Sequence, residues 1–394
     1  MGTMPIGRGQ AKAIFDARLK TSHSPEYLAS KRALALRRWF VALSQRATAT
    51  ADIWTITDSI FEGNGLTSYL GRLPYLALTK LRTNYPTAGI AGGLGYIAPY
   101  MATSQTADWP VVNTGGSGLT QGYGLGTRGR LWSATGNKSV FSFSGATHVG
   151  VLYYRVGTGG AAGHFTYQID AGATTDVNCQ LSTASDFIEI VITIPDTGAH
   201  TVTVAWVSGS VIFDGFMHYN QDSTAGGIRL WEGGHGGGDC STFMGDATHT
   251  LLLGNQATRI QADVVVVELF ANDFTGTTPV SAATASTRLD TIISTVRANT
   301  TIAPSIVLIP VWELHNANTP LDLWSTFVNV LYAKADADAA ICVLDFQQRV
   351  KTALGSSDTG QGILSNAEGT WPSHPNDQGA AYLAEVLARF LSPQ

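Results

Sequence analysis

A serine stands where a predicted strand gives way to a predicted helix. Residues 52–57 form a short run rich in β-branched and apolar residues, typical of a buried strand, and Asp58 and Ser59 follow directly. A glycine-rich turn and a helical pattern over residues 66–84 come next. Such a serine lies at the carboxyl edge of a sheet, where its hydroxyl can be exposed and the N–H groups of the following helix point at whatever binds. The alternative is a turn serine beside a capping aspartate.

Two further stretches carry polar residues in comparable positions. His374 precedes an amphipathic helix near the C-terminus, and an apolar strand in mid-chain ends in Asn272 and Asp273. Acyl transfer is a chemistry that needs a nucleophile, a base to take its proton, and donors aimed at the developing oxyanion. Ser59, His374 and Asn272 are all predicted at the edge where open α/β sheets bind ligands. The alternative is that they form only a helix-start loop and a strand-end turn.

The order of these motifs along the chain resembles that of the SGNH (GDSL-type) hydrolases. The resemblance covers residues 51–104 and 226–394. It implies a serine hydrolase in which Ser59 is the nucleophile and His374 is the base.

The same resemblance implies three donors to the oxyanion. They are the backbone N–H of Ser59, the side-chain amide of Asn272, and a glycine N–H in the loop after the second strand. Matching Gly-Asp-Cys-Ser to the family's Gly-Asp-Thr-Ser pattern selects Gly238, with Gly237 next to it. Glycine suits this role because the backbone must approach the substrate closely.

The sequence departs from the family pattern at three positions. Thr57 and Phe270 stand where family members usually carry glycine, and Trp371 stands where an aspartate normally lies three residues before the histidine. Some group must hold the imidazole of His374 in the right tautomer. Glu368 could do so if Trp371-Pro-Ser is an insertion, or a backbone carbonyl could serve and leave a Ser-His dyad.

Several residues beside these motifs are predicted to contact the substrate. They lie next to the serine, in the glycine loop, after the middle strand, after the fourth strand and before the histidine. They are Asp58, His235, Asp273, His315 and Trp371.

Composition and charge narrow the class of protein. The chain has 394 residues, enough for two or three domains, with 13% charged residues and a net charge of -5, so no nucleic-acid partner is expected. Three cysteines without a Cys-x-x-Cys pair indicate free thiols. No histidine has metal-ligand spacing with a neighbour, and no cofactor is expected. Neither an apolar run of membrane-spanning length nor a secretory signal is visible, so the protein is expected to be made in the cytoplasm.

Strand and helix patterns divide the chain into four parts. Residues 1–50 indicate a basic helical segment, while residues 51–104 and 226–394 alternate strands and helices as hydrolase parts. Their five strands predict an α/β fold with a parallel, doubly wound sheet, which the family resemblance makes flavodoxin-like. Residues 105–225 show short strands with regular turn signals, which predicts an inserted β-sandwich that folds independently.

The sandwich and the N-terminal segment each allow two interpretations. Four aromatic residues of the sandwich could form a sugar-stacking platform or pack in its core: Trp132, Tyr153, Tyr154 and Trp206. The basic N-terminal helix could lie on a membrane surface. We favour packing on its own domain or on a neighbouring subunit.

Two functions follow from these observations. The first is an esterase acting on ester groups of a carbohydrate or cell-envelope substrate, with the sandwich as a carbohydrate-binding module. The alternative is a structural adhesin, a minor tail protein that binds host glycans with little or no catalysis. The layout resembles tail-associated SGNH proteins of phages that infect actinobacteria, which implies a virion location and contacts with other virion proteins through the N-terminal segment. The sequence leaves a homo-oligomer open.

Overall fold

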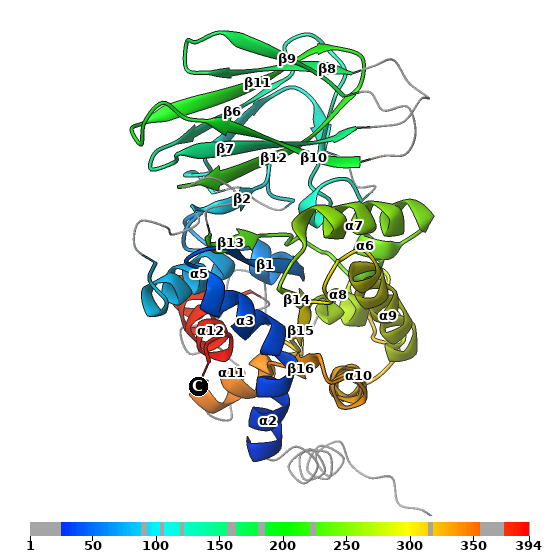
Figure 1. The fold of residues 1–394 in the computed structure, drawn as a ribbon. Helices are drawn as coiled ribbons and strands as arrows, with labels where there is room; N and C mark the ends of the chain where they lie inside the picture. Colours follow the sequence, from blue (N-terminus) through cyan, green and yellow to red (C-terminus); the bar gives the residue numbers. More distant parts are fainter. Residues whose placement is uncertain are drawn as a thin grey trace, which may run out of the picture.

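Five parallel strands form the central sheet (Figure 1). The computed structural model describes residues 25–87, 93–102, 106–118, 122–155, 163–179, 186–220, 226–313, 318–354 and 374–393. The sheet strands are β1 (Thr50–Thr57), β13 (Gly227–Trp231), β14 (Val264–Glu268), β15 (Ser305–Leu308) and β16 (Ile341–Val343). Their order, β13-β1-β14-β15-β16, is 2-1-3-4-5 along the chain, so the predicted doubly wound sheet is confirmed.

Helices cover both faces of this sheet, which explains why nearly every residue of its strands is buried. All five residues of β14 are buried, as expected for a parallel strand covered on both sides. One face carries α2 (Pro25–Ala35), α3 (Arg37–Gln45), α5 (Leu73–Asn84), α11 (Phe346–Leu354) and α12 (Asp377–Phe390) (Figure 1). The other carries α6 (Cys240–Met244), α7 (Ala247–Ile260), α8 (Phe270–Thr275), α9 (Ala282–Ala298) and α10 (Trp324–Ala337).

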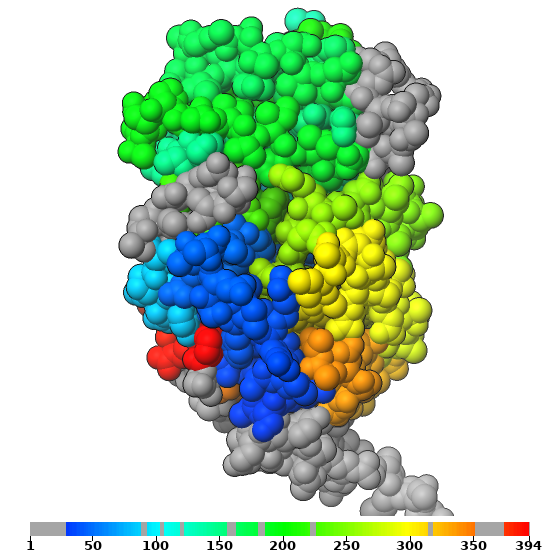
Figure 2. All heavy atoms as spheres, viewed as in Figure 1, coloured from blue at the N-terminus to red at the C-terminus, as the bar shows by residue number. Residues whose placement is uncertain are grey.

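The N-terminal helices pack on their own domain. Trp39 is fully buried, and its indole N–H donates to the carbonyl oxygen of Leu391 at 2.7 Å. Arg32 donates to the carbonyl oxygen of Phe390 at 2.7 Å, so α2 lies beside the C-terminal helix, red in Figure 2. The favoured interpretation, packing on the protein itself, is confirmed for residues 25–45. Residues 1–24 lie outside the described part of the chain.

A buried carboxylate holds α3 to the sheet. Asp263, directly before β14, accepts the backbone N–H of Asp52 at 3.0 Å and pairs with Arg38 at 2.5 Å. Burial raises the pKa of Asp263 to about 6, against the lowering effect of these two partners. The folded protein therefore binds a proton here at a pH where the unfolded chain does not.

This shift gives a stability prediction with a definite sign. The pKa of Asp263 is higher in the folded protein than in the unfolded chain, so protonation of this group stabilises the fold. This stabilisation is complete at low pH and is lost as the pH rises through about 6. Between pH 7 and pH 5, the wild-type free energy of unfolding should rise by about 1 kcal/mol relative to Asp263→Asn, whose side chain does not titrate. Urea denaturation of both proteins at several pH values measures this. Parallel pH profiles would contradict the assignment.

Eleven strands between residues 95 and 219 build two antiparallel sheets that face each other. One has the order β10-β7-β12-β5-β4, with β2 also pairing with β12, and the other has the order β3-β6-β11-β8-β9. The strands are β2 (Gly95–Ile97), β3 (Val111–Thr114), β4 (Ser117–Gly118), β5 (Arg130–Trp132), β6 (Lys138–Phe143), β7 (His148–Arg155), β8 (His164–Ile169), β9 (Thr174–Asn178), β10 (Asp186–Thr193), β11 (His200–Ser208) and β12 (Val211–Tyr219). The inserted β-sandwich is confirmed, and it stands on one end of the sheet domain (Figure 1).

Aromatic residues fill the space between the two sandwich sheets. Phe141 stacks on Phe216 with ring centroids 5.0 Å apart. Trp132, Tyr153 and Tyr154 are all buried, so they do not form a sugar-stacking platform. Tyr153 packs on Phe165 of the facing sheet, whereas Tyr154 lies on the other face of β7, where its hydroxyl accepts from Gln256 of α7 at 3.0 Å. The fourth candidate, Trp206, is half-buried and donates its indole N–H to the carbonyl oxygen of Gly209 at 2.7 Å.

The chain enters the sandwich through a strand that the sequence analysis placed before the insertion. β2 pairs with β12, aligning Ile97 with Phe216 and Gly95 with His218. Gly95 has a φ of +87°, and a Cβ there would lie 2.5 Å from the carbonyl oxygen of Leu230 in β13. The glycine therefore lets β2 approach the edge of the central sheet. The exact limits of the insertion, 105–225, remain a prediction.

Candidate active site

The two residues proposed for acyl transfer are in hydrogen-bond contact. β1 ends at Thr57, and the short helix α4 (Ser59–Glu62) begins with Ser59. The Oγ atom of Ser59 lies 2.7 Å from Nε2 of His374, although 315 positions separate them in the chain. His374 is brought there by the loop before α12, whose N-terminus is capped by the side chain of Asn376 accepting the Gly379 N–H at 2.9 Å. This is the geometry by which a histidine takes the proton of a serine hydroxyl.

The contact lies at the point of the sheet where ligands are expected. Ser59 follows β1, and Asn272 lies just after the neighbouring strand β14. In a sheet of order 2-1-3-4-5, the strand order reverses between these two strands, and open α/β sheets bind ligands at the carboxyl ends of the strands at such a point. Ser59 and Asn272 thus both lie at the predicted edge of the sheet.

Asp58 lies directly before α4 and is shielded from solvent, with 1% of its surface exposed. Its carboxylate accepts the backbone N–H of Ile60 at 2.8 Å and the side-chain amide of Asn272 at 3.1 Å. In place of the predicted substrate contact, the structure gives Asp58 the task of capping α4 and tying it to α8. The cause is local: an aspartate before a helix satisfies the helix's first N–H groups.

Glu268, the last residue of β14, forms a buried carboxyl pair with Asp58. Burial raises the pKa of Glu268 well above its ordinary value, and the neighbouring charge of Asp58 raises it further. Burial also raises the pKa of Asp58, while the hydrogen bond from Glu268 opposes this rise. Two carboxyl groups in contact do not both ionise, so Glu268 holds the proton and donates to Asp58.

Asn272 lies in a helix and not at the end of a strand. The apolar strand predicted to end in Asn272 stops at Glu268, and α8 begins at Phe270. The amide nitrogen of Asn272 donates both to Asp58 and, at 2.9 Å, to the carbonyl oxygen of Gly238. A substrate oxyanion must therefore compete with one of these acceptors, and the oxyanion role of Asn272 remains a prediction.

The glycine loop between β13 and α6 turns tightly beside these residues. The N–H of Gly238 donates to the carbonyl oxygen of His235 at 2.8 Å, and a Cβ on Gly238 would lie 2.8 Å from that same oxygen. Gly237 is exposed, with a φ of +74° that favours glycine. The N–H selected from the sequence, that of Gly238, is thus engaged inside the loop, and donation from Gly238 or Gly237 to an oxyanion remains a prediction.

Asp273 is fully buried, so its carboxylate is not exposed to a ligand. One carboxylate oxygen accepts the N–H of Cys240 at 2.9 Å, and the other lies 3.3 Å from Nη1 of Arg288. In place of the predicted substrate contact, Asp273 anchors the first turn of α6 to α8. Cys240 is itself buried, as are the other two cysteines.

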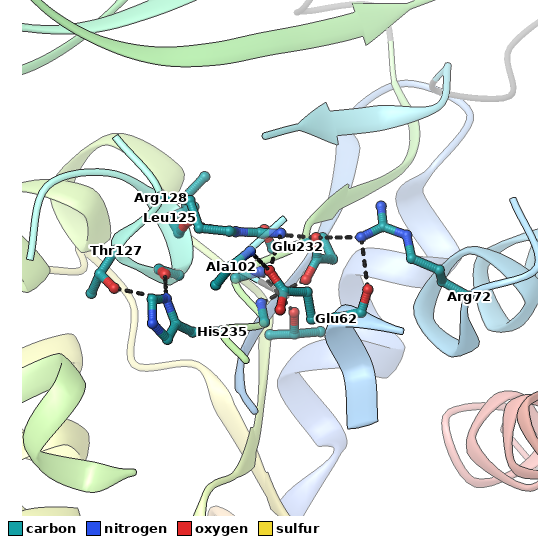
Figure 3. A network of polar contacts seen from close by, with 12 residues as sticks. Glu62, Arg72, Ala102, Leu125, Thr127, Arg128, Glu232 and His235 are labelled. Carbon is teal, nitrogen blue, oxygen red and sulfur yellow. Dashed lines mark hydrogen bonds and ion pairs between the residues drawn. The ribbon is translucent and has the colours of Figure 1, made fainter. Parts of the chain in front are cut away.

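His235 is half-buried and faces a loop of the inserted region (Figure 3). Its Nδ1 atom lies 2.5 Å from the carbonyl oxygen of Gly126 and 2.9 Å from Oγ1 of Thr127. A carbonyl oxygen only accepts, so Nδ1 carries the proton and Nε2 is left as an acceptor. Burial lowers the pKa of His235, which favours this neutral form.

Three predicted site residues lie outside the described part of the chain: His315, Glu368 and Trp371. The group that orients His374 therefore remains a prediction. Within the described ranges, no cluster of three or more His, Cys, Asp or Glu side chains is arranged to hold a metal ion. No described helix has the length and apolar character needed to cross a membrane.

Sequence reasoning missed a buried ionic cluster next to the site. Its members are Glu62, Arg72, Arg128 and Glu232, with 0% side-chain exposure each (Figure 3). The available signal was the Gly-rich run 122–129 that contains Arg128, because it places a charged residue among glycines.

The sheet order, the serine–histidine contact and the inserted sandwich together define a fold like that of SGNH-type carbohydrate esterases. The structure resembles a solved structure described as "Peptidoglycan O-acetylesterase in action, 5 min", with a TM-score of 0.61 and 15% identity, over 90% of this chain and 94% of that chain. At this identity the likeness shows a shared fold.

Two family two carbohydrate esterases match more weakly. The one from Clostridium thermocellum, in complex with cellohexaose, has a TM-score of 0.32 and 15% identity over 66% of this chain and 93% of that chain. The one from Cellvibrio japonicus has a TM-score of 0.30 and 12% identity over 72% and 94%. No family model matches the sequence, and no curated protein matches it.

Proposed function

We propose that the protein is a serine esterase of SGNH type that removes acyl groups from a carbohydrate, with a cell-envelope ester as the substrate class. The observation that carries this proposal is the 2.7 Å contact between Ser59 Oγ and His374 Nε2 at the carboxyl edge of the sheet. The full-length likeness to a structure described as a peptidoglycan O-acetylesterase supports the substrate class.

The reaction follows from the positions of these groups. Nε2 of His374 takes the hydroxyl proton as Oγ of Ser59 bonds to the ester carbonyl carbon, giving a tetrahedral oxyanion. Collapse of this intermediate breaks the bond to the sugar oxygen, which leaves with the proton from His374. Water, deprotonated by His374, then attacks the acyl-serine. Collapse of this second intermediate breaks the bond to Oγ of Ser59, which takes the proton back from His374 as the carboxylic acid is released. Backbone and amide donors near Ser59 would stabilise both oxyanions.

Purified protein should release p-nitrophenol from p-nitrophenyl acetate and acetate from O-acetylated peptidoglycan. Acetylated xylan, offered at the same ester concentration, serves as the comparison polymer. If the protein hydrolyses p-nitrophenyl acetate but acts equally fast on the peptidoglycan and the xylan, the esterase proposal stands. The assignment of a cell-envelope ester as substrate is then contradicted. Absence of Ser59-dependent hydrolysis on all three would contradict the esterase proposal and favour the adhesin.

A place on a phage tail, with the N-terminal segment bound to other virion proteins, remains a proposal. It rests on the layout of the sequence. Mass spectrometry of purified phage particles from an infected host tests it, and a particle without this chain would contradict it.

A further inference from the structure

A cluster of four buried charges joins the nucleophile helix to the inserted region (Figure 3). Arg128 comes from the loop between β4 and β5, whereas Glu62, Arg72 and Glu232 come from the sheet domain. Nη2 of Arg128 lies 2.8 Å from Glu232, and its Nη1 lies 3.5 Å from Glu62. Arg72 lies 3.3 Å from Glu232. With two cations and two anions, the cluster is neutral as a whole.

Glu62 places this cluster next to the nucleophile. It is the last residue of α4, three positions after Ser59. Its carboxylate also accepts the N–H of Ala102 at 2.6 Å, and its carbonyl oxygen accepts Nη1 of Arg72 at 3.2 Å. A one-turn helix has almost no stability of its own. The position of α4, and hence of Ser59, therefore depends on these outside contacts.

Arg128 balances the buried carboxylates. Burial raises the pKa of Glu62, and Arg128 is the largest influence that opposes this rise. For Glu232, Arg128 and Arg72 together outweigh burial and lower its pKa. Without Arg128, two buried carboxylates would share one guanidinium, and a buried charge without its partner is strongly destabilising.

The same loop also presses against the glycine loop of the active site. A Cβ added to Gly126 would lie 2.4 Å from the carbonyl oxygen of Gly234, so the two backbones are in direct contact. Nδ1 of His235 bonds to Gly126 and Thr127, as described above. His235 in turn accepts the N–H of Gly238 through its carbonyl oxygen. The inserted region thus contacts His235, and His235 contacts Gly238, the predicted oxyanion donor in the glycine loop.

Thr127 holds a backbone conformation that its residue type disfavours. Its φ is +53°, in the left-handed region, where a β-branched residue is a genuine outlier. Such a conformation is strained and persists when surrounding contacts enforce it. Here the N–H of Thr127 donates to Gly124 O at 2.9 Å, and Gly129 N–H donates to Tyr123 O at 2.8 Å. The strained backbone of Thr127 thus lies at the residue whose hydroxyl contacts His235.

We propose that Thr127 and Arg128 of the inserted region are positioning residues of the active site. Arg128 fixes the nucleophile helix through Glu62, and Thr127 fixes the glycine loop through His235. The proposal rests on the esterase function and deepens it, because it makes the sandwich part of the catalytic unit. The expectation that residues 105–225 fold as an independent module, leaving an active core when removed, is the opposing view.

The Arg128 arm is tested by comparing two variants. Arg128→Met leaves the cluster with one net negative charge, whereas Glu62→Gln/Arg128→Met restores neutrality but not the link. We expect both to lower kcat about tenfold with KM within about twofold, because the nucleophile is misplaced. Only the double variant should regain a wild-type Tm. If kcat recovers together with Tm in the double variant, Arg128 serves folding alone and the proposal fails.

The Thr127 arm is tested without relying on activity. Thr127→Val keeps the β-branched shape and removes the hydroxyl, and Thr203→Val makes the same change in β11, away from the site. We expect amide hydrogen exchange over residues 233–238 to accelerate about tenfold in Thr127→Val and not in Thr203→Val. Unchanged exchange in both would overturn the positioning role. Loss of the esterase proposal would instead show as absent Ser59-dependent hydrolysis in the wild type, while the exchange result still decides the loop.

Discussion

We expect Ser59→Ala to lower the rate of ester hydrolysis by at least about a thousandfold, as for loss of an activated nucleophile. The Oγ atom of Ser59 is the group that His374 contacts at 2.7 Å, and alanine removes it. The backbone of residue 59 accepts the N–H groups of Gly63 and Asn64 whatever its side chain, so the helix should keep its place. Hydrolysis of p-nitrophenyl acetate under saturating substrate measures the effect.

Ser241→Ala provides the matched control for this variant. Ser241 lies in the first turn of α6, and its hydroxyl donates to Asp239 at 2.7 Å. Losing that hydroxyl should leave the hydrolysis rate within about threefold of wild type, because Ser241 contacts neither His374 nor Ser59 in the described structure. Wild-type activity in Ser59→Ala, with the control equally active, would show that another residue carries the reaction.

Asn272→Ala should cost roughly 3 kcal/mol of transition-state stabilisation, a loss of about a hundredfold in kcat with little change in KM. Two physical causes act together. The amide of Asn272 is the predicted oxyanion donor, and it also bridges Asp58 and the carbonyl oxygen of Gly238. Removing it leaves Gly238, and with it the glycine loop, without its tie to α4.

Glu268→Gln is the control for Asn272→Ala. It changes the buried carboxyl pair of Glu268 and Asp58 but leaves the amide of Asn272 in place. A glutamine amide donates to Asp58 as protonated Glu268 does, so this variant should keep kcat within about threefold. Steady-state kinetics on both variants, with Tm recorded in parallel, decides the question. A raised KM with an unchanged kcat in Asn272→Ala would mean that Asn272 contacts the ground state and not the oxyanion.

The sheet domain could be predicted because its signals are local. The sequence predicts a helix over residues 282–298, and α9 has those limits in the structure. Likewise, β14 begins where the valine run at Val264 begins. The run of apolar residues through Phe270 concealed the start of α8, since a helix of six residues shows no periodicity. There Phe270 is buried by packing on Phe327, with ring centroids 5.6 Å apart.

The support of the active site could not be predicted, because it depends on contacts between distant parts of the chain. Arg128 and Glu232 are 104 residues apart, and Arg72 and Glu232 are 160 apart. Arginine and glutamate are exposed in most proteins, so sequence alone assigns them to the surface. The positive φ of Thr127 was likewise invisible, although the glycines at positions 124 and 126 indicate a turn.

The paired strands β2 and β12 have a mechanical consequence for how the sandwich is held on the sheet domain. They carry the chain into and out of the sandwich, and β2 also touches β13 of the central sheet. A second brace joins Arg259 of α7 to the buried Glu189 of β10. A single flexible linker bends and twists freely, whereas two hydrogen-bonded strands with a lateral brace resist both motions. The orientation of the sandwich relative to the Ser59 edge of the central sheet is therefore fixed, so the two parts should tumble in solution as one rigid body.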